Sequence, residues 1–426
     1  MLPEQFLDRM KEVLGEEYDD FFNSYDQPPI RSLRISHLKD ADERVREMVD
    51  FLGEEVPWAG GGYYYKEGSR PGKHPFHEAG VYYIQEASAM APVPALGVLP
   101  GERVLDLCAA PGGKSAQIGD ALAGQGILVC NEIHPQRAKI LSENMERMGI
   151  GNALVLNHEP AYLAEHFQEA FDRVLVDAPC SGEGMLRKNE DVAVQWNPEN
   201  VAMCAARQRE IMGYAASMLR QGGCMVYSTC TFAPEENEEN IDWFLKEYPE
   251  FSLEESRRFW PHKVKGEGHY LARLKKRGAG RASAFWGGER GIKEKDCKEW
   301  LEFKEKHLKR DLQGTYVTFG GQLYLVPKEC PSLKGLKALR PGLHLGTVKK
   351  DRFEPSHALA LFLKPEDVVF SYHLSVEQAG KYIKGETFAA QGEKGWYLVC
   401  VEGYSLGFGK LAGGIMKNHY PKGLRK

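Results

Sequence analysis

The 426-residue chain contains no run of about 18 uncharged apolar residues, which is the length that a membrane-spanning helix needs. Its first residues, MLPEQFLDRMKEVLGEEYDDFF, are acidic and amphipathic, whereas a secretory signal peptide begins with basic residues followed by an apolar segment. Apolar residues make up 42% of the chain, enough to build more than one hydrophobic core. We therefore predict a cytoplasmic protein without a membrane segment.

Motifs for disulfides and metal sites are also missing. The nine cysteines are odd in number and include no C-x-x-C pair, which argues against a disulfide or zinc framework. The 13 histidines show no H-x-x-x-H spacing with a third ligand. We predict reduced thiols and no metal site.

The net charge of −5 conceals an uneven distribution of charge along the chain. Residues 1–255 hold 22 Lys and Arg against 43 Asp and Glu, whereas residues 256–426 hold 33 against 17. Such asymmetry indicates that the basic half meets a polyanion such as nucleic acid. The alternative is a basic surface that is merely solvated.

From Tyr82 onward, apolar strand-like runs alternate with helix-like segments and short loops. Continuous apolar strands that alternate with helices are typical of a parallel sheet covered on both faces, so we predict a doubly wound α/β domain. The expected strands are 103–108, 126–131, 152–157, 172–177 and 223–229, and the expected helices are 113–123, 135–148, 199–220 and 235–247.

The regions on either side of this domain have other patterns. The first 75 residues combine an amphipathic helix, Glu4–Leu14, with short extended segments. Beyond Phe251 the alternation ends, and the stretch from LARLKK to KDCKEW is basic, glycine-rich and weakly patterned. Short strand candidates follow, including GTYVTFGGQLYLVP, HALALFL and GWYLVCVEGYSLGFGKL, and they predict a compact β-rich end. The predicted domains are 1–75, 76–277, a basic connector at 278–310, and 311–426.

Three loops that carry reactive or glycine-rich sequence each follow an apolar strand: DLCAAPGGKS, VDAPCSGEGM and YSTCTFAPEENE. Ligands of open α/β sheets bind at the carboxyl ends of strands, so we expect these loops to form one site. The first loop is not a phosphate loop, because Cys108 stands where that motif needs glycine. It still supplies a tight turn that lets the backbone approach a ligand. Cys180 and Cys230 occupy the other two loops.

Acidic residues follow several of the same strands. Glu132 is at the position that contacts ribose hydroxyls in nucleotide-binding folds, and its alternative role is an ordinary carboxylate at a helix N-terminus. Glu159 follows the third strand and is as well explained as a plain surface acid. Asp177 ends the fourth strand, where Pro179 disfavours an immediate helix, so we expect its carboxylate to point into the cleft.

The set DLCAAPGGK, DAPCSGEG and YSTCTFAPEENE resembles the Nop/Sun family of RNA cytosine-5 methyltransferases, most closely its bacterial members that act on small-subunit ribosomal RNA. PPIRSLRISHLK resembles the family's N-terminal segment, with Ser36 where Asn is usual, and YSLGFGKLAGGIMKNHYPKGLRK resembles the end of a PUA-like RNA-binding domain. The resemblance implies a Rossmann-like α/β methyltransferase domain that depends on S-adenosylmethionine. It also implies a small N-terminal α+β domain and a C-terminal PUA-like domain.

The resemblance also implies roles for particular residues. Glu132 would bind the ribose of S-adenosylmethionine, Glu159 matches an adenine contact where the family commonly has Asp, and Asp177 would lie near the methionine end and the target base. Cys230 would be the nucleophile, Cys180 would assist product release, and Lys114 with Asp177 would stabilise the activated base. The loop residues implied to hold the cofactor are Cys108, Ala109, Ala110, Pro111, Gly112, Gly113 and Lys114.

The residues alone leave some alternatives open. DNA cytosine methyltransferases attack with the cysteine of a P-C motif, so the order of the two thiols is not decided by their spacing. The implied partner is ribosomal RNA or the 30S subunit, and we expect a monomer. A transfer RNA methylase, a DNA methyltransferase and a non-catalytic RNA-binding assembly factor are the rival functions.

Overall fold

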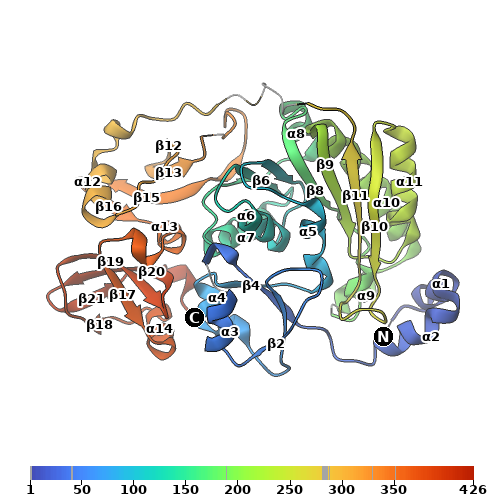
Figure 1. The fold of residues 1–426 in the computed structure, drawn as a ribbon, viewed down its shortest axis with the longest axis horizontal. Helices are drawn as coiled ribbons and strands as arrows, with labels where there is room; N and C mark the ends of the chain where they lie inside the picture. Colours follow the sequence, from blue (N-terminus) through green and yellow to red (C-terminus); the bar gives the residue numbers. More distant parts are fainter. Residues whose placement is uncertain are drawn as a thin grey trace.

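The computed structural model describes residues 2–39, 42–188, 190–280, 286, 288–328, 330–350 and 352–426 (Figure 1). Its helices are α1 Glu4–Leu14, α2 Tyr18–Ser24, α3 Asp42–Met48, α4 Pro75–Glu78, α5 Pro92–Leu96, α6 Gly113–Ala121, α7 Pro135–Arg147, α8 Pro160–His166, α9 Glu190–Gln195, α10 Pro198–Met218, α11 Glu238–Glu247, α12 Lys298–His307, α13 His357–Phe362 and α14 Val376–Ile383. None of the helices in the described ranges is long and apolar enough to cross a membrane.

The strands form four sheets. They are β1 Ser32–Ile35, β2 Leu52–Glu55, β3 Gly62–Tyr65, β4 Tyr82–Ile84, β5 Arg103–Asp106, β6 Ile127–Asn131, β7 Ala153–Leu156, β8 Phe171–Asp177, β9 Leu219–Thr229, β10 Phe251–Phe259, β11 His269–Lys276, β12 Thr315–Phe319, β13 Gln322–Val326, β14 Ala338–Pro341, β15 Leu343–Lys349, β16 Arg352–Pro355, β17 Ser371–Leu374, β18 Phe388–Ala389, β19 Gly395–Val401, β20 Tyr404–Ala412 and β21 Ile415–Asn418.

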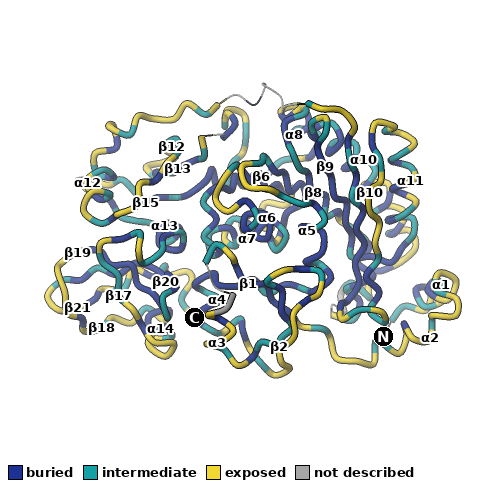
Figure 2. The backbone as a smooth tube through the Cα atoms, viewed as in Figure 1, coloured by how far each residue is buried: buried dark blue, intermediate teal, exposed yellow. Residues whose placement is uncertain are grey.

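The central sheet confirms the predicted doubly wound α/β domain. Its order is β10-β11-β9-β8-β5-β6-β7-β14, and the five strands from β9 to β7 are parallel. One face packs on α8, α10 and α11, and the other on α5, α6 and α7. Figure 2 shows these strands as a buried centre between the helices. Apolar side chains cover both faces, which is why the strands read as continuous apolar runs.

The N-terminal sheet has the order β2-β3-β1-β4, so it extends past the boundary predicted at residue 75. Helices α1 and α2 do not pack on it but lie beside the catalytic domain, near α9 and β10 in Figure 1. Phe6 contacts Trp196 and Phe21 contacts Phe232, with ring centroids 5.6 and 5.4 Å apart. The beginning of the chain therefore packs directly against the loop that carries Cys230.

Two expectations about the chain beyond Phe251 were wrong. The LARLKK stretch is not part of a weakly patterned connector but belongs to β11, which pairs antiparallel with both β9 and β10. The HALALFL run is not a strand but helix α13, whose first turn is capped by Ser356 Oγ accepting a hydrogen bond from the Leu359 amide at 3.0 Å. Periodicity alone cannot separate a buried helix from a strand over so few residues.

The C-terminal part contains two sheets, with orders β12-β13-β15-β16 and β17-β19-β20-β21-β18. Helix α12 lies within the stretch predicted as a connector, and residues 281–285 and 287 of that stretch are outside the described residues. Strand β14 pairs antiparallel with β7, so the C-terminal part supplies an edge strand of the catalytic sheet. The catalytic sheet is therefore completed by residues far along the chain.

Candidate active site

The three loops expected at one site do lie together. Strands β5, β8 and β9 are neighbours in the sheet, and all three run parallel, so their carboxyl ends share one edge. Asp177 at the end of β8 pairs in register with Ser228 of β9. The two cysteine loops leave the sheet directly beyond this pair. The glycine-rich loop leaves it beside them.

The glycine-rich loop opens onto a pocket of about 240 Å³. Gly112 has a backbone φ of +114°, which residues other than glycine rarely adopt. A Cβ atom at this position would lie 3.1 Å from Leu141 Cδ1. The glycine is thus needed for the turn into α6. The lining residues are Tyr83, Ile84, Gln85, Glu86, Ala89, Asp106, Cys108, Ala109, Ala110, Pro111, Gly113, Lys114 and Asp177.

Asp106 gives this pocket a buried, incompletely satisfied carboxyl group. Ser115 Oγ donates a hydrogen bond to Asp106 Oδ2 at 2.6 Å, whereas Oδ1 is buried without a hydrogen-bond partner in the described structure. Burial raises the pKa of Asp106 to about 7. A cationic group of a ligand would satisfy the free oxygen. The ammonium of S-adenosylmethionine has this chemistry, so the pocket fits the cofactor.

Lys114 and Asp177 form an ion pair across the same pocket, with Nζ and Oδ2 2.7 Å apart. Ser228 Oγ donates to the other carboxylate oxygen at 2.8 Å. Burial raises the pKa of Asp177, but Lys114 and His269 outweigh it and leave the pKa below its ordinary value. Asp177 is therefore an ionised carboxylate, and Lys114 is held beside it at the entrance to the cysteine loops.

The two predicted acidic contacts differ in the structure. Glu132 is buried, accepts the His134 amide at 2.9 Å, and pairs with Arg137, which donates to the Ala110 carbonyl at 2.8 Å. It thus joins the end of β6 to the glycine-rich loop, although it does not line the pocket. Glu159 is exposed at the N-terminus of α8 and also lies outside the pocket lining.

The two cysteines of the second and third loops are brought into contact. Cys180 Sγ and Cys230 Sγ lie 3.3 Å apart, and both are free thiols that are partly exposed. The hydrogen bond with Cys230, followed by burial, raises the pKa of Cys180 well above its ordinary value. Cys180 therefore keeps its proton and can donate it toward the sulfur of Cys230.

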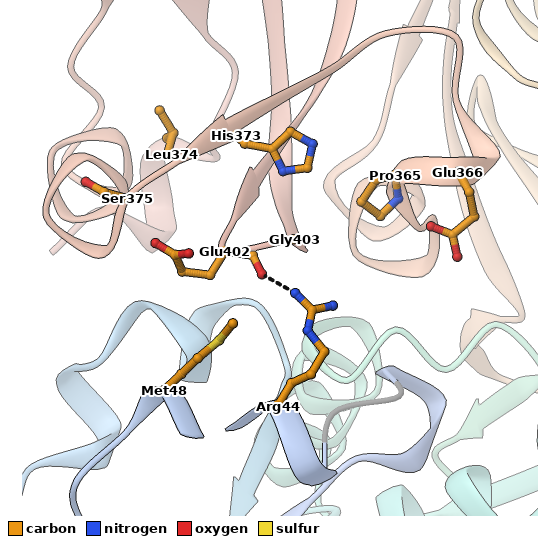
Figure 3. Close-up of a pocket in the computed structure, with 9 residues that line it drawn as sticks. All are labelled: Arg44, Met48, Pro365, Glu366, His373, Leu374, Ser375, Glu402 and Gly403. Carbon is orange, nitrogen blue, oxygen red and sulfur yellow. Dashed lines mark hydrogen bonds between the residues drawn. The ribbon is translucent and has the colours of Figure 1, made fainter. Parts of the chain in front are cut away.

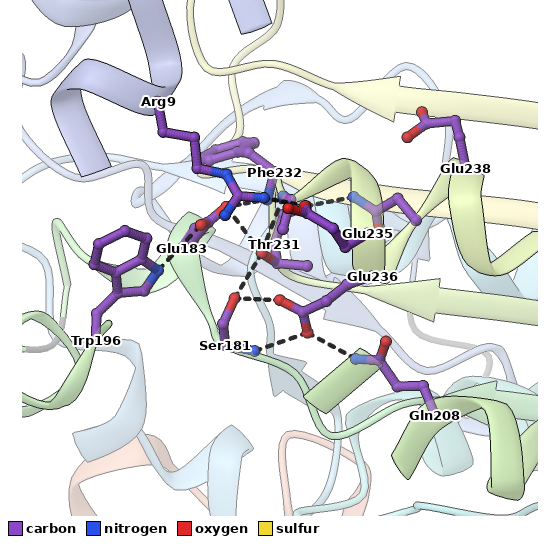
Figure 4. Close-up of polar contacts among 12 residues, drawn as sticks. Arg9, Ser181, Glu183, Trp196, Gln208, Thr231, Phe232, Glu235, Glu236 and Glu238 are labelled. Carbon is purple, nitrogen blue, oxygen red and sulfur yellow. Dashed lines mark hydrogen bonds and ion pairs between the residues drawn. The ribbon is translucent and has the colours of Figure 1, made fainter. Parts of the chain in front are cut away.

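Behind the thiols lies a buried polar network that the sequence analysis missed (Figure 4). Glu183 follows Cys180 by three positions, and Glu236 follows Cys230 by six. Both carboxyl groups point back between the loops and are fully buried, which is rare for glutamate unless it is paired. Their sequence signal is an acid at fixed spacing after each cysteine, but many surface loops carry such acids.

A separate pocket of about 600 Å³ lies between α3 and the C-terminal sheet (Figure 3). Arg44 spans it and donates to the Glu402 carbonyl at 2.9 Å. None of the predicted site residues lines this pocket. Within the described part of the chain, no group of three or more His, Cys, Asp or Glu is arranged to hold a metal ion.

A parallel sheet covered by helices on both faces, with a pocket at the carboxyl ends of β5 and β8, is a Rossmann-like ligand-binding fold. The family models place this fold in the class of S-adenosylmethionine-dependent methyltransferases. Family models agree over most of the chain. Residues 2–87 match the N-terminal domain of 16S rRNA methyltransferase RsmF, and residues 93–275 match 16S rRNA methyltransferase RsmB/F. Residues 302–363 match the RsmF first C-terminal domain, and residues 369–426 match the RsmF PUA domain.

Similar proteins narrow the assignment. Ribosomal RNA small subunit methyltransferase F of Vibrio vulnificus is 32% identical over 99% of this chain and 97% of the relative. The enzyme of the same name from Cronobacter sakazakii is 31% identical over 99% of this chain and 96% of the relative. The chain belongs to the ribosomal RNA small subunit methyltransferase F family. A solved methyltransferase homolog from Pyrococcus horikoshii is 27% identical, with a TM-score of 0.58 over 64% of this chain and 95% of that one.

Proposed function

We propose that the protein methylates carbon 5 of cytosine in 16S ribosomal RNA through a covalent cysteine adduct at carbon 6. The observation that carries the proposal is the pair of free thiols 3.3 Å apart, next to the Lys114–Asp177 ion pair and the cofactor pocket. Neither thiol is needed for the packing of the sheet, because both lie beyond the strand ends.

The cofactor supplies the methyl group, and residues of this chain hold it. The loop from Cys108 to Lys114 would hold it by its backbone, the Asp106 carboxyl would pair with its cationic end, and Glu132 would bind its ribose. Asp177 lines the pocket and ends the strand that leads into the Cys180 loop. Nothing in the geometry supports the adenine contact predicted for Glu159.

Cytosine carbon 5 is a poor nucleophile, so catalysis requires a thiolate to add to carbon 6 first. This addition makes carbon 5 electron-rich enough to accept a methyl group, and covalent catalysis thereby replaces one difficult step by easier ones. We assign this attack to Cys230, because its loop YSTCTFAPEENE resembles the loop that carries the nucleophile in the Nop/Sun family. The raised pKa of Cys180 is in line with a partner thiol that keeps its proton. Loss of the proton at carbon 5 then expels the Cys230 thiolate, and Cys180 assists this release.

The ion pair is assigned to the activated base. The ammonium of Lys114 can donate to a polar edge of the ring, and the carboxylate of Asp177 can accept from its exocyclic amine. Because Asp177 has a low pKa, it remains an acceptor over the neutral pH range. A stacked cytosine must leave its helix to reach these groups, which favours loop or single-stranded targets.

The C-terminal part offers a groove of about 810 Å³ for the RNA backbone, between α12, β16 and the sheet of β19 to β21. Lys410 lies 5.1 Å from the centre of the Trp396 ring. Burial, then the charges of Lys306 and Lys410, lower the pKa of His307. Five basic residues line the groove against three acidic ones, Glu299, Glu302 and Glu354. Its basic members are Lys298, Lys306, Arg352, Lys410 and Lys417.

The test separates the two thiols. Cys230→Ala is expected to abolish methyl transfer and to form no protein–RNA adduct. Cys180→Ala is expected to form the adduct and then stall, which leaves an RNA complex that resists denaturation. Cys204→Ala on α10 is the control and should behave as the parent protein. An adduct in Cys230→Ala would reverse the two roles.

The substrate is tested independently. Bisulfite mapping of ribosomal and transfer RNA from a deletion strain should reveal cytosines of 16S RNA that lose their 5-methyl group. Loss from transfer RNA alone would favour the rival substrate. No loss from any RNA, together with no adduct in vitro, would favour the non-catalytic assembly factor.

A further inference from the structure

The two cysteine loops hold each other through two glutamates in a reciprocal arrangement (Figure 4). Glu236, from the Cys230 loop, accepts a hydrogen bond from the amide of Ser181 at 3.0 Å, and its other carboxyl oxygen is hydrogen-bonded to the Ser181 hydroxyl. Glu183, from the Cys180 loop, accepts from the Thr231 hydroxyl at 2.9 Å. Each glutamate therefore holds the residue that follows the other loop's cysteine. These contacts link the two loops directly beyond their cysteines.

The hydroxyl groups complete a continuous chain of four residues, Glu183–Thr231–Ser181–Glu236. Ser181 Oγ and Thr231 Oγ1 lie 2.8 Å apart, which joins the two halves. The chain thus contains three hydrogen bonds, and each needs one hydrogen atom. The two hydroxyls supply only two. A third hydrogen has to come from one of the carboxyl groups, so one glutamate is protonated.

The N–H donors around each carboxyl group decide which of the two glutamates is protonated. Glu183 accepts Trp196 Nε1 at 3.0 Å on one oxygen and the Phe232 amide at 2.9 Å on the other. Glu236 Oε2 accepts the Ser181 amide and Gln208 Nε2, the latter at 2.7 Å. In the described structure Glu236 Oε1 faces only the Ser181 hydroxyl. It is the one carboxyl oxygen of the four that can carry a hydrogen without facing an N–H donor.

The hydrogen bonds around Gln208 confirm that its amide nitrogen, and not its oxygen, faces Glu236. Arg209 Nε, which can only donate, binds Asn240 Oδ1 at 2.8 Å, and Asn240 Nδ2 binds Gln208 Oε1 at 2.9 Å. The amide nitrogen of Gln208 is therefore the end that faces Glu236.

We infer that Glu236 is a neutral carboxylic acid that donates through Ser181 and Thr231 to an ionised Glu183, and that this chain positions the two thiols. The charged and titratable groups around the chain are consistent with a charge on Glu183 and none on Glu236. Arg9 of α1, which is paired with Glu235, attracts the charge on Glu183, and Tyr227 donates to the Glu236 carbonyl at 2.6 Å. No cation in the described residues faces Glu236.

A neutral Glu236 also suits the thiol chemistry. Cys180 lies close enough to Glu236 that a negative charge there would raise the pKa of the thiol further. With the proton on Glu236 and the charge on Glu183, that charge is moved away from Cys180 and toward Arg9. Glu236 and Glu183 are therefore positioning residues. The state of protonation is independent of the substrate, whereas the role in positioning the thiols rests on the proposed function.

Infrared difference spectroscopy tests the protonation directly, at about pH 8 and in an Asp106→Asn background, which removes the buried carboxyl with a pKa of about 7. We expect the C=O stretch of a buried carboxylic acid. It should disappear in Glu236→Gln and persist in Glu183→Gln. Loss in Glu183→Gln alone would place the proton on Glu183, and the absence of the band before either substitution would overturn the inference.

The positioning role is tested by alkylation of Cys230 with iodoacetamide across pH. Glu236→Gln keeps the neutral group and its donor, so its pH profile should match that of the parent, whereas Glu236→Ala should shift the profile. If Gln behaves like Ala, an ionised Glu236 is the working form and the inference fails. Alkylation needs no RNA, so this result stands even if the proposed substrate is wrong.

Discussion

The cofactor pocket and the two cysteine loops lie at the same edge of the central sheet, but they differ in how far their buried carboxyl groups are satisfied by hydrogen bonds. On the cofactor side, Asp106 keeps a buried oxygen without a partner, and its pKa rises to about 7. On the cysteine side, Glu183 and Glu236 are buried as deeply, yet each oxygen of their carboxyl groups has a hydrogen-bond partner. The first region therefore leaves a polar group for a ligand to satisfy, whereas the second is satisfied by the protein itself.

The difference follows from what each region does. A ligand that brings its own charge binds most tightly where the protein has left a matching group unsatisfied. In the proposed mechanism the two thiols attack and release in sequence, which requires a fixed separation before the substrate arrives, so we expect their supports to be in place without ligand. An unsatisfied polar group thus indicates a binding role, and a satisfied buried network indicates a positioning role.

The largest effect on the cofactor side is expected from Asp106→Asn. Loss of the charged partner should weaken S-adenosylmethionine binding by about 1.5–3 kcal/mol, the range for hydrogen bonds to charged groups. Calorimetric titration measures the affinity. Asp242→Asn, an exposed acid on α11, is the matched control and should leave it unchanged. Equal affinities for Asp106→Asn and the parent would remove Asp106 from the cofactor site.

Glu132→Ala should weaken cofactor binding by a similar amount, about 1.5–3 kcal/mol, through loss of a charged hydrogen-bonding group. Glu159→Ala should change it by less than about 0.5 kcal/mol, because Glu159 is exposed and outside the pocket. The same calorimetry compares the two. A large loss in Glu159→Ala would mean that α8 moves toward the ligand.

Stability should respond with opposite signs on the two sides. Glu183→Gln places the side-chain NH2 group against the indole N–H of Trp196 or the amide N–H of Phe232, so that two donors face each other. The free energy of unfolding should therefore fall by about 1–3 kcal/mol. Asp106→Asn removes a buried charge that lacks a partner, so above about pH 7 it should leave stability unchanged or raise it. Urea denaturation of both variants without ligand gives the comparison. Destabilisation by Asp106→Asn would show that the carboxyl is satisfied after all.

Cofactor binding should also depend on pH. Asp106 has its pKa raised to about 7, so it is neutral below that pH and ionised above it. A cationic ligand prefers the ionised form, and its affinity should fall as the pH drops below about 7, by up to about tenfold per unit. The Asp106→Asn variant should show a flatter dependence. An equally steep profile in that variant would assign the titration to another group.

The smallest effects are expected in the basic groove, where each contact is made separately. Lys410→Ala or Lys417→Ala should reduce the slope of log affinity for RNA against log salt by about 0.7–0.9. Binding across a salt series measures the slope, and Lys139→Ala on α7, an exposed lysine outside the groove, is the control. Unchanged slopes would mean that the groove is only a solvated surface.

Much of the catalytic domain could be predicted from the sequence. The apolar strands and the glycine-rich turn are local signals, and the parallel arrangement places three successive loops at one edge. The loops of Cys180 and Cys230 were expected at one edge of the sheet, and the structure brings the two sulfurs to within 3.3 Å. Secondary structure was harder to predict where an element is short or lies at the edge of the sheet. Strand β10 exposes charged residues and α13 is only six residues long.

The support of the thiols could not be predicted in this way. Glu183 and Glu236 each look like surface acids in their own loops, and their burial depends on the pairing of β8 with β9. The same holds for β14, which completes the catalytic sheet from the C-terminal part. A chain that ended before β14 would leave β7 as an open edge, so substitutions test the groove more cleanly than truncation does.

The sequence by itself determined the fold class, the loops that carry Cys180 and Cys230, and the glycine turn at Gly112, because each depends on neighbours along the chain. Only the tertiary structure decided that one carboxyl oxygen of Glu236 faces a single hydroxyl, whereas both carboxyl oxygens of Glu183 meet an N–H donor. The state of a buried proton is set by the donors and acceptors packed around it. Those groups come from segments far apart in the sequence, so only the folded chain brings them together.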